Sequence, residues 1–213
     1  MNGYWIFKEN KEQKKSSYYE WGVEVHQNEI GYRADSIYSD GFKVMSLGCS
    51  MTYGYGLCDN ETWPKLLTDR IPNCVNLNFG VTGCSNDRIV RNLIKYYDFI
   101  KPDLVIIMWT SVVRREYFTD SLVNDYTFED CYDQPYGKYD FVPQYISENK
   151  TAQDIFKLLI ELSNKQEDST NWYKNYLLAN YFLRLKNAKW IFLDWDFDTP
   201  NRLSSINDTN YID

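Results

Sequence analysis

The stretch KVMSLGCSMTYGYGL, from Lys43 to Leu57, decides the fold of this chain. It opens with an apolar run, Val44 to Leu47, of the length expected for a buried strand. The run breaks at Gly48, and Ser50 follows in a turn of small residues. Binding sites of open α/β sheets form at the carboxyl ends of their strands, so this turn predicts a site that contains Ser50. The alternative is a tight turn in which Ser50 only caps a helix.

Strands and helices are expected to alternate after this stretch. Apolar runs predict strands at residues 43–47, 74–78, 103–109 and 189–194. Between the first three, we expect a helix from Asp59 or Asn60 to about Arg70 and a second helix capped by Ser85. This βαβαβ order with short loops predicts an α/β domain whose parallel strands are joined by right-handed crossovers, with helices on both faces.

The remaining segments predict one domain with an extension and an insertion. Residues 1–40 are polar and aromatic, and we expect an N-terminal extension packed on an α/β domain at residues 41–213. Within that domain, residues 112–150 lose hydrophobic periodicity, which indicates an insertion of the kind that is usually functional or mobile. Two further helices are expected, one from Thr151 and one over residues 171–186.

Composition narrows the classes of function. The 213 residues carry a net charge of −7 without a clustered basic face, which argues against nucleic-acid and anionic-membrane partners. No signal peptide or membrane-spanning run is present, so we expect a cytoplasmic or otherwise soluble protein. Five cysteines without C-x-x-C spacing favour free thiols, and a single histidine excludes a histidine-based metal cluster. Neither a phosphate loop nor a dinucleotide fingerprint occurs, so we expect no cofactor and no metal.

Two glycine-containing blocks resemble those of the SGNH (GDSL-type) hydrolases. The residues from Gly48 to Gly54 are similar to the first block of that family, G-x-S-x-T-x-G. The segment from Asn78 to Ser85 resembles the second block. The resemblance implies a three-layer, flavodoxin-like fold, with Ser50 as the nucleophile and the N–H of Gly83 as an oxyanion donor. The alternative is that Gly83 only makes a tight loop between strand and helix.

The later blocks depart from the SGNH pattern. Where the family has G-x-N-D, the chain reads Trp-Thr-Ser-Val at residues 109–112. Ser111 takes the position of the oxyanion asparagine, and its hydroxyl can donate one hydrogen bond. Arg114 is a candidate to face an anionic or sugar substrate; the alternative is an ordinary surface arginine. The D-x-x-H block is absent, because no histidine follows His26, which we expect to be a surface or packing residue.

Two functions follow from this pattern. The first is an SGNH-type hydrolase of an ester or acetyl group, with a small-molecule or carbohydrate ester as substrate. Its base would lie beyond residue 213, and the chain would be C-terminally incomplete. The second is a non-catalytic protein of SGNH-like fold that holds a glycan in the same cleft or is structural. The intact first block favours the hydrolase, whereas the missing histidine and Ser111 favour the binding protein. For the hydrolase we predict about 3–5 Å between the Gly83 nitrogen and the Ser50 hydroxyl oxygen.

Overall fold

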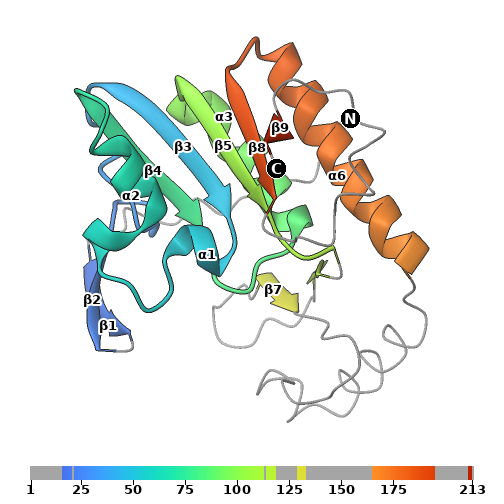
Figure 1. Cartoon of the computed structure of the whole chain (residues 1–213), viewed down its shortest axis with the longest axis horizontal. Helices are drawn as coiled ribbons and strands as arrows, with labels where there is room; N and C mark the ends of the chain where they lie inside the picture. Colours follow the sequence, from blue (N-terminus) through green and yellow to red (C-terminus); the bar gives the residue numbers. More distant parts are fainter. Residues whose placement is uncertain are drawn as a thin grey trace.

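A computed structural model places one central sheet with helices packed around it (Figure 1). The structure describes residues 16–20, 22–112, 114–118, 129–132, 165–194 and 211–212. The described strands are β1 (Ser16–Glu20), β2 (Val23–Gln27), β3 (Phe42–Gly48), β4 (Cys74–Gly80), β5 (Leu104–Trp109), β6 (Arg115–Phe118), β7 (Glu129–Tyr132), β8 (Trp190–Asp194) and β9 (Tyr211–Ile212). The described helices are α1 (Ser50–Tyr53), the 3₁₀ helix η1 (Asp59–Glu61), α2 (Trp63–Thr68), α3 (Asn86–Ile100) and α6 (Lys165–Leu185).

The central sheet has the strand order β4-β3-β5-β8-β9, and every neighbouring pair in it is parallel. In the register of the sheet, Leu47 of β3 pairs with Phe79 of β4 and with Ile107 of β5. The predicted α/β class, the parallel sheet and the four predicted strands are therefore confirmed. Because the strands run the same way, the segments that follow β3, β4 and β5 all leave from one edge of the sheet, at the lower end in Figure 1.

The strands form where the sequence is apolar on both faces. On one face, Met45 and Leu47 of β3 and Ile107 of β5 have no exposed surface. On the other, Val44 of β3 has none and Ile106 of β5 is 3% exposed, as is typical of a parallel sheet. Aromatic rings then close the core between β5, β8 and α6. Trp109 lies 5.3 Å from Phe192 and 6.4 Å from Tyr176 between ring centroids. These contacts fix α6 against the sheet beside the end of β5.

Helix α3 begins as its sequence predicts. The Ser85 side chain accepts a hydrogen bond from the backbone N–H of Arg88, at 3.2 Å. The helix buries Ile89 and Leu93 in the core. It ends at Lys101, which adopts the left-handed conformation with φ of 51°, before Pro102. The cap places the first turn of α3 at the same edge of the sheet as the Ser50 turn.

The predicted helix between Asp59 and Arg70 is wrong in its extent. The structure has two short pieces instead, η1 and α2, separated by Thr62 in an extended conformation. Pro64 falls in the first turn of α2, where its missing N–H is tolerated, but its ring disfavours a helix through the residues before it. The helix therefore starts again at Trp63 rather than running on from Asp59.

Three short described strands, β6, β7 and β9, were not predicted. Strand β9 lies in the polar C-terminal tail and pairs in parallel with β8. Strands β6 and β7 form an antiparallel pair within residues 112–150. Strand β9 has two residues and strands β6 and β7 have four each. Such short strands show no clear alternation of apolar and polar residues in the sequence. Residues 119–128 and 133–150, and the predicted helix from Thr151, lie outside the described residues.

The N-terminal segment contacts the domain at β4. Strands β1 and β2 form an antiparallel pair separate from the central sheet. After them, the backbone N–H of Asp35 donates to the carbonyl of Asn76 at 2.8 Å, and the Asp35 carboxylate accepts from the Asn76 N–H at 2.8 Å. Ile37 is part of the hydrophobic core. In the described part of the chain, no helix has the length and apolar character needed to cross a membrane.

Candidate functional site

Ser50 is the first residue of α1, directly after β3. Cys49 before it is extended, and the helix ends at Gly54, whose φ of 82° lets its N–H donate to the Ser50 carbonyl. The Ser50 side chain is half-buried, and its Oγ lies 4.0 Å from the Cys49 Sγ. As a first-turn residue of a helix, Ser50 has a backbone N–H that needs no partner within the helix. Its hydroxyl and its N–H lie at the end of β3, at this edge of the sheet.

Close packing explains the glycines on either side of this turn. A side chain at Gly48 would overlap the side chain of Thr52, which is fully buried. A side chain at Gly80 would overlap the backbone of Thr52 and Tyr53. Helix α1 therefore lies directly on the ends of β3 and β4, and the spacing of Gly, Ser and Thr in residues 48–52 is a packing requirement as well as a motif.

The loop after β4 lies on the end of β3. The Gly48 carbonyl accepts hydrogen bonds from the Val81 N–H at 3.0 Å and from the Cys84 thiol at 3.2 Å. Between these residues, Gly83 has a φ of 68°, and a side chain added there would meet open space. Gly83 is thus at the same edge of the sheet as Ser50, on a loop held by two hydrogen bonds. The predicted distance between the Gly83 nitrogen and the Ser50 hydroxyl stays a prediction.

Asn86 holds the end of β5. Its side-chain oxygen accepts from the Thr110 N–H at 2.9 Å, and its Nδ2 donates to the carbonyls of Thr110 and Ser111 at 3.0 and 3.4 Å. Asn86 is almost completely buried, whereas Ser111 is half-buried. Arg114 turns back toward this strand end, where its Nη1 donates to the Thr110 hydroxyl at 2.8 Å. The end of β5 is therefore fixed beside the first turn of α3.

Arg33 fixes the loop that follows α1. Its guanidinium donates to the carbonyls of Gly54 at 2.8 Å, Tyr53 at 3.3 Å and Leu57 at 2.5 Å. The Nε donates to the Asp59 carboxylate at 2.5 Å. The Arg33 side chain is only 3% exposed, so these bonds satisfy a charge that is removed from water. The backbone immediately after Ser50 is thereby held at several points.

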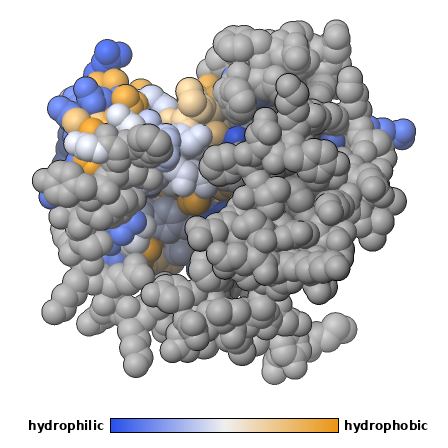
Figure 2. Space-filling model, turned by 90° about the horizontal axis from the view of Figure 1, so that it is seen from below, coloured by the Kyte–Doolittle hydropathy of each residue, from blue (hydrophilic) through white to orange (hydrophobic). Residues whose placement is uncertain are grey.

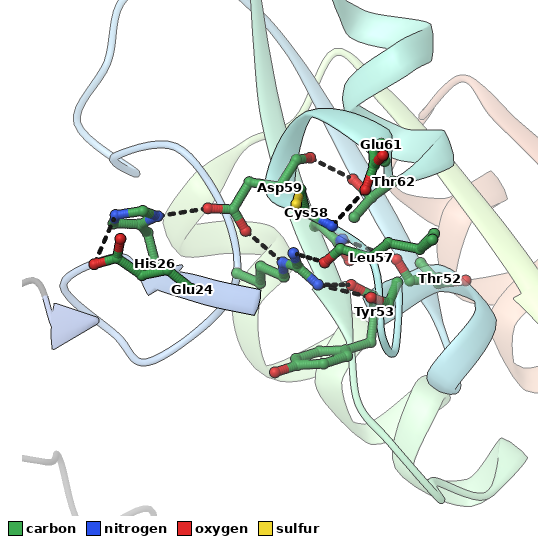
Figure 3. A network of polar contacts seen from close by, with 12 residues as sticks. Glu24, His26, Thr52, Tyr53, Leu57, Cys58, Asp59, Glu61 and Thr62 are labelled. Atoms are coloured by element: carbon green, nitrogen blue, oxygen red, sulfur yellow. Dashed lines mark hydrogen bonds and ion pairs between the residues drawn. The ribbon is translucent and has the colours of Figure 1, made fainter. Parts of the chain in front are cut away.

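His26 lies on β2 at the outer end of this network. Its Nδ1–H donates to the second oxygen of Asp59 at 2.6 Å, and its Nε2 lies 3.6 Å from the Glu24 carboxylate. The hydrogen bond to Asp59 is the main cause that raises the pKa of His26 above its usual value, and the ring is 64% exposed. In Figure 3 the contacts run from His26 through Asp59 to the carbonyls beside α1. His26 thus has the surface position expected from the sequence.

Three positioning residues were not singled out from the sequence: Arg33, Asn78 and Asn86. Asn78 is fully buried in β4; its Nδ2 donates to the Thr52 carbonyl at 2.8 Å, and its Oδ1 accepts from the Gly80 N–H at 2.9 Å. An asparagine inside an apolar strand is the signal that could have marked it, since a buried amide needs partners. Nothing in their own neighbourhoods marks Arg33 or Asn86, because their partners are distant in sequence.

Comparison with known proteins gives a family without an assigned activity. A family described as "Family of unknown function (DUF6071)" matches residues 54–209, which is more than half of the chain. The chain belongs to this family. The match begins after Ser50, and it includes Gly83, Ser111 and Arg114. No curated protein matches the sequence. Within the described residues, no three His, Cys, Asp or Glu side chains are grouped closely enough to hold a metal ion.

Proposed function

We propose that this protein is an SGNH-type serine hydrolase that cleaves an ester or acetyl group, with small-molecule and carbohydrate esters as the candidate substrates. Ser50 is the nucleophile. The N–H groups of Ser50 and Gly83 and the hydroxyl of Ser111 are the proposed oxyanion donors, and Arg114 is proposed to contact the substrate.

One observation carries the proposal. The segments that follow β3, β4 and β5 leave the parallel sheet at one edge and are joined there by hydrogen bonds. The Ser50 turn follows β3, and the loop that contains Gly83 is bonded to the Gly48 carbonyl at the end of β3. Asn86, in the first turn after that loop, bonds the backbone at Ser111. A hydroxyl and backbone N–H groups at one edge are two of the three components that acyl transfer by serine needs, the third being a base, and this supports the proposal.

The proposed chemistry proceeds through an acyl-enzyme. The Ser50 oxygen forms a bond to the ester carbonyl carbon, and the carbonyl oxygen takes the negative charge of the tetrahedral intermediate. Hydrogen bonds from the backbone donors stabilise that charge. The bond between that carbon and the alcohol oxygen then breaks, and the alcohol leaves with the proton that the Ser50 hydroxyl lost. Water then attacks the acyl carbon, the bond to the Ser50 oxygen breaks, the carboxylic acid leaves, and a proton of the water returns to Ser50.

The strand order supports a three-layer, flavodoxin-like fold. Counted from β3 along the chain, the order β4-β3-β5-β8-β9 is 2-1-3-4-5, which is the flavodoxin-like order. Helix α3 packs against α6, whereas α2 packs on β4. We propose that these helices cover opposite faces of the sheet and make a three-layer domain.

Labelling of the serine tests the proposal most directly. An ethyl fluorophosphonate reacts with an activated serine hydroxyl, and mass spectrometry of the digested protein locates the adduct. We expect the adduct on Ser50 and its loss in Ser50→Ala, with Ser46→Ala as the matched control because Ser46 is a buried serine of β3. Because the base is missing from this chain, the adduct should form slowly. An adduct elsewhere, or none at a probe concentration and reaction time that label a serine without a base, would exclude Ser50 as the nucleophile.

Turnover of p-nitrophenyl acetate tests whether His26 serves as the general base for Ser50. A positioned base accelerates such a reaction by about 10²–10⁴-fold. His26 is engaged with Asp59 and Glu24, so we expect very weak turnover of this 213-residue chain and no change in His26→Ala. Fast turnover that disappears in His26→Ala would show that His26 leaves Asp59 and serves as the base.

The end of β5 favours a second function, glycan binding without catalysis. Where SGNH hydrolases have an asparagine, this chain has Ser111, whose carbonyl accepts bonds from Asn86 and from the Arg114 N–H, at 3.4 and 3.3 Å. A binding protein needs no nucleophile. Glycan binding that is equal in the natural chain and in Ser50→Ala, with no fluorophosphonate adduct, would support this second function over hydrolysis.

A further inference from the structure

Three large apolar side chains are exposed in the segment that follows Ser50. Met51 is 59% exposed, Tyr55 47% and Leu57 41%. Large apolar side chains that face water singly are ordinary, but these three lie within residues 51–57, directly after Ser50. Figure 2 views the molecule from the edge of the sheet where this segment lies, and apolar surface appears there in several places among polar surface.

The backbone that carries these side chains is fixed relative to Ser50. The Tyr55 N–H donates to the Ser50 carbonyl at 3.1 Å, and the Leu57 N–H donates to the Gly54 carbonyl at 3.1 Å. Arg33 holds the carbonyl of Leu57 from the interior. Met51 is the residue after Ser50 in α1. The apolar side chains are therefore presented by an ordered backbone next to the proposed nucleophile.

The chemistry of these side chains selects the kind of group that they contact. Met51 and Leu57 are aliphatic, and the three side chains together carry a single hydroxyl, that of Tyr55. A sugar ring brings several hydroxyl groups that lose water on binding and need partners. An alkyl or aryl group needs none, and its contact with these side chains removes apolar surface from water on both partners.

We propose that Met51, Tyr55 and Leu57 form the binding surface for an apolar arm of the ester substrate, so that the substrate class is an alkyl or aryl ester rather than a simple sugar acetate. This inference rests on the proposed serine hydrolase function. The apolar arm lies along residues 51–57 while the ester carbonyl lies at Ser50.

Binding to Ser50→Ala protein tests the surface without any turnover. Octanoate and acetate share a carboxylate and differ only in their alkyl chain, and NMR titration measures both affinities. We expect octanoate to bind at least about tenfold more tightly, since each buried methylene contributes up to about fourfold. In the Ser50→Ala background, Leu57→Ser and Tyr55→Ser should each lower octanoate affinity about threefold or more.

Matched controls separate this surface from exposed apolar residues in general. Leu178→Ser on α6 and Tyr38→Ser, which precedes β3 at the opposite edge of the sheet, replace side chains that are 51% and 71% exposed. Both should leave octanoate affinity unchanged. Equal affinities for octanoate and acetate would overturn the inference. Equal losses in the control variants and in the variants of Tyr55 and Leu57 would also overturn it.

Labelling of the natural chain distinguishes this inference from the function on which it rests. Octyl fluorophosphonate should label Ser50 faster than ethyl fluorophosphonate, and Leu57→Ser should reduce that preference. Labelling at equal rates by both probes would refute the apolar surface and leave the serine chemistry intact. No labelling, together with tight octanoate binding that depends on Leu57, would refute the hydrolase and support the apolar surface.

Discussion

Two loops at the edge of the sheet that carries the Ser50 turn are each held by one buried polar side chain, but these two side chains differ in chemistry. Arg33 is charged; it bonds three carbonyls in residues 53–57 and reaches the surface through Asp59. Asn86 is neutral and 1% exposed. Its side chain both donates hydrogen bonds to the backbone of residues 110–111 and accepts one from it. Each replaces hydrogen bonds that a regular helix or strand would have provided.

The difference decides which loop responds to solution conditions. The Asp59 side chain is 35% exposed and contacts both Arg33 and His26. Changes in pH and in salt concentration therefore alter the interactions that hold the loop beside Ser50. Asn86 has no ionisable group and little contact with water. We therefore expect the contribution of the loop after α1 to protein stability to depend on pH, and the contribution of the end of β5 to be independent of pH. The following substitutions test that contrast, in order of expected effect.

Arg33→Met should be the most destabilising change. It removes the donors of three carbonyls, and each buried group left without a partner costs about 1–3 kcal/mol, so we expect a loss of about 3–5 kcal/mol. Urea denaturation measures the loss in the free energy of unfolding. Arg70→Met, at an exposed position, is the control and should change it by less than about 0.5 kcal/mol. A similar small change for both variants would show that Arg33 does not hold the loop.

Asn86→Leu should lower the free energy of unfolding by about 2–3 kcal/mol, because the N–H and the carbonyl of Thr110 both lose their partner in the interior. The loss should be the same at pH 6 and pH 8, as the amide does not titrate. Asn60→Leu, at an exposed asparagine, is the control. A loss that changes between the two pH values would contradict the assignment of Asn86 as a holding group independent of pH.

Arg33→Lys separates charge from geometry in the Arg33 network. Lysine keeps the positive charge near Asp59 but cannot replace a planar group that donates to four acceptors, so we expect a loss of about 1–2 kcal/mol. The same urea denaturation measures it, next to Arg33→Met. If both substitutions cost the same, the charge contributes nothing and the hydrogen-bond geometry alone holds the loop.

His26 should give the smallest effect, and it depends on pH. The pKa of His26 is raised in the folded protein, mainly by its hydrogen bond to Asp59. Its stabilising contribution is therefore complete below the unfolded pKa of about 6.5 and is lost as pH rises through the higher folded pKa. Melting temperatures at pH 5.5 and pH 8 should differ less in His26→Gln than in the natural chain. An unchanged difference would show that the ring does not interact with Asp59 in solution.

The sequence by itself determined the parts of the fold that depend on neighbouring residues. The apolar runs at β3, β4, β5 and β8 predicted four parallel strands, and Ser85 was correctly placed as the cap of α3. A strand is indicated by consecutive apolar residues, and a helix cap acts within three residues. The turn with Ser50 was also placed correctly, because a glycine directly after a strand is a local signal.

The tertiary structure alone decided how the site edge is held. Asn86 reaches Thr110 across 24 residues, and Arg33 reaches Leu57 across 24, so no local pattern shows either pairing. Strand β9 is set by pairing with β8 rather than by an apolar run of its own. Each of these features exists because buried backbone groups must find partners, and the fold determines which distant side chain is near enough to supply one.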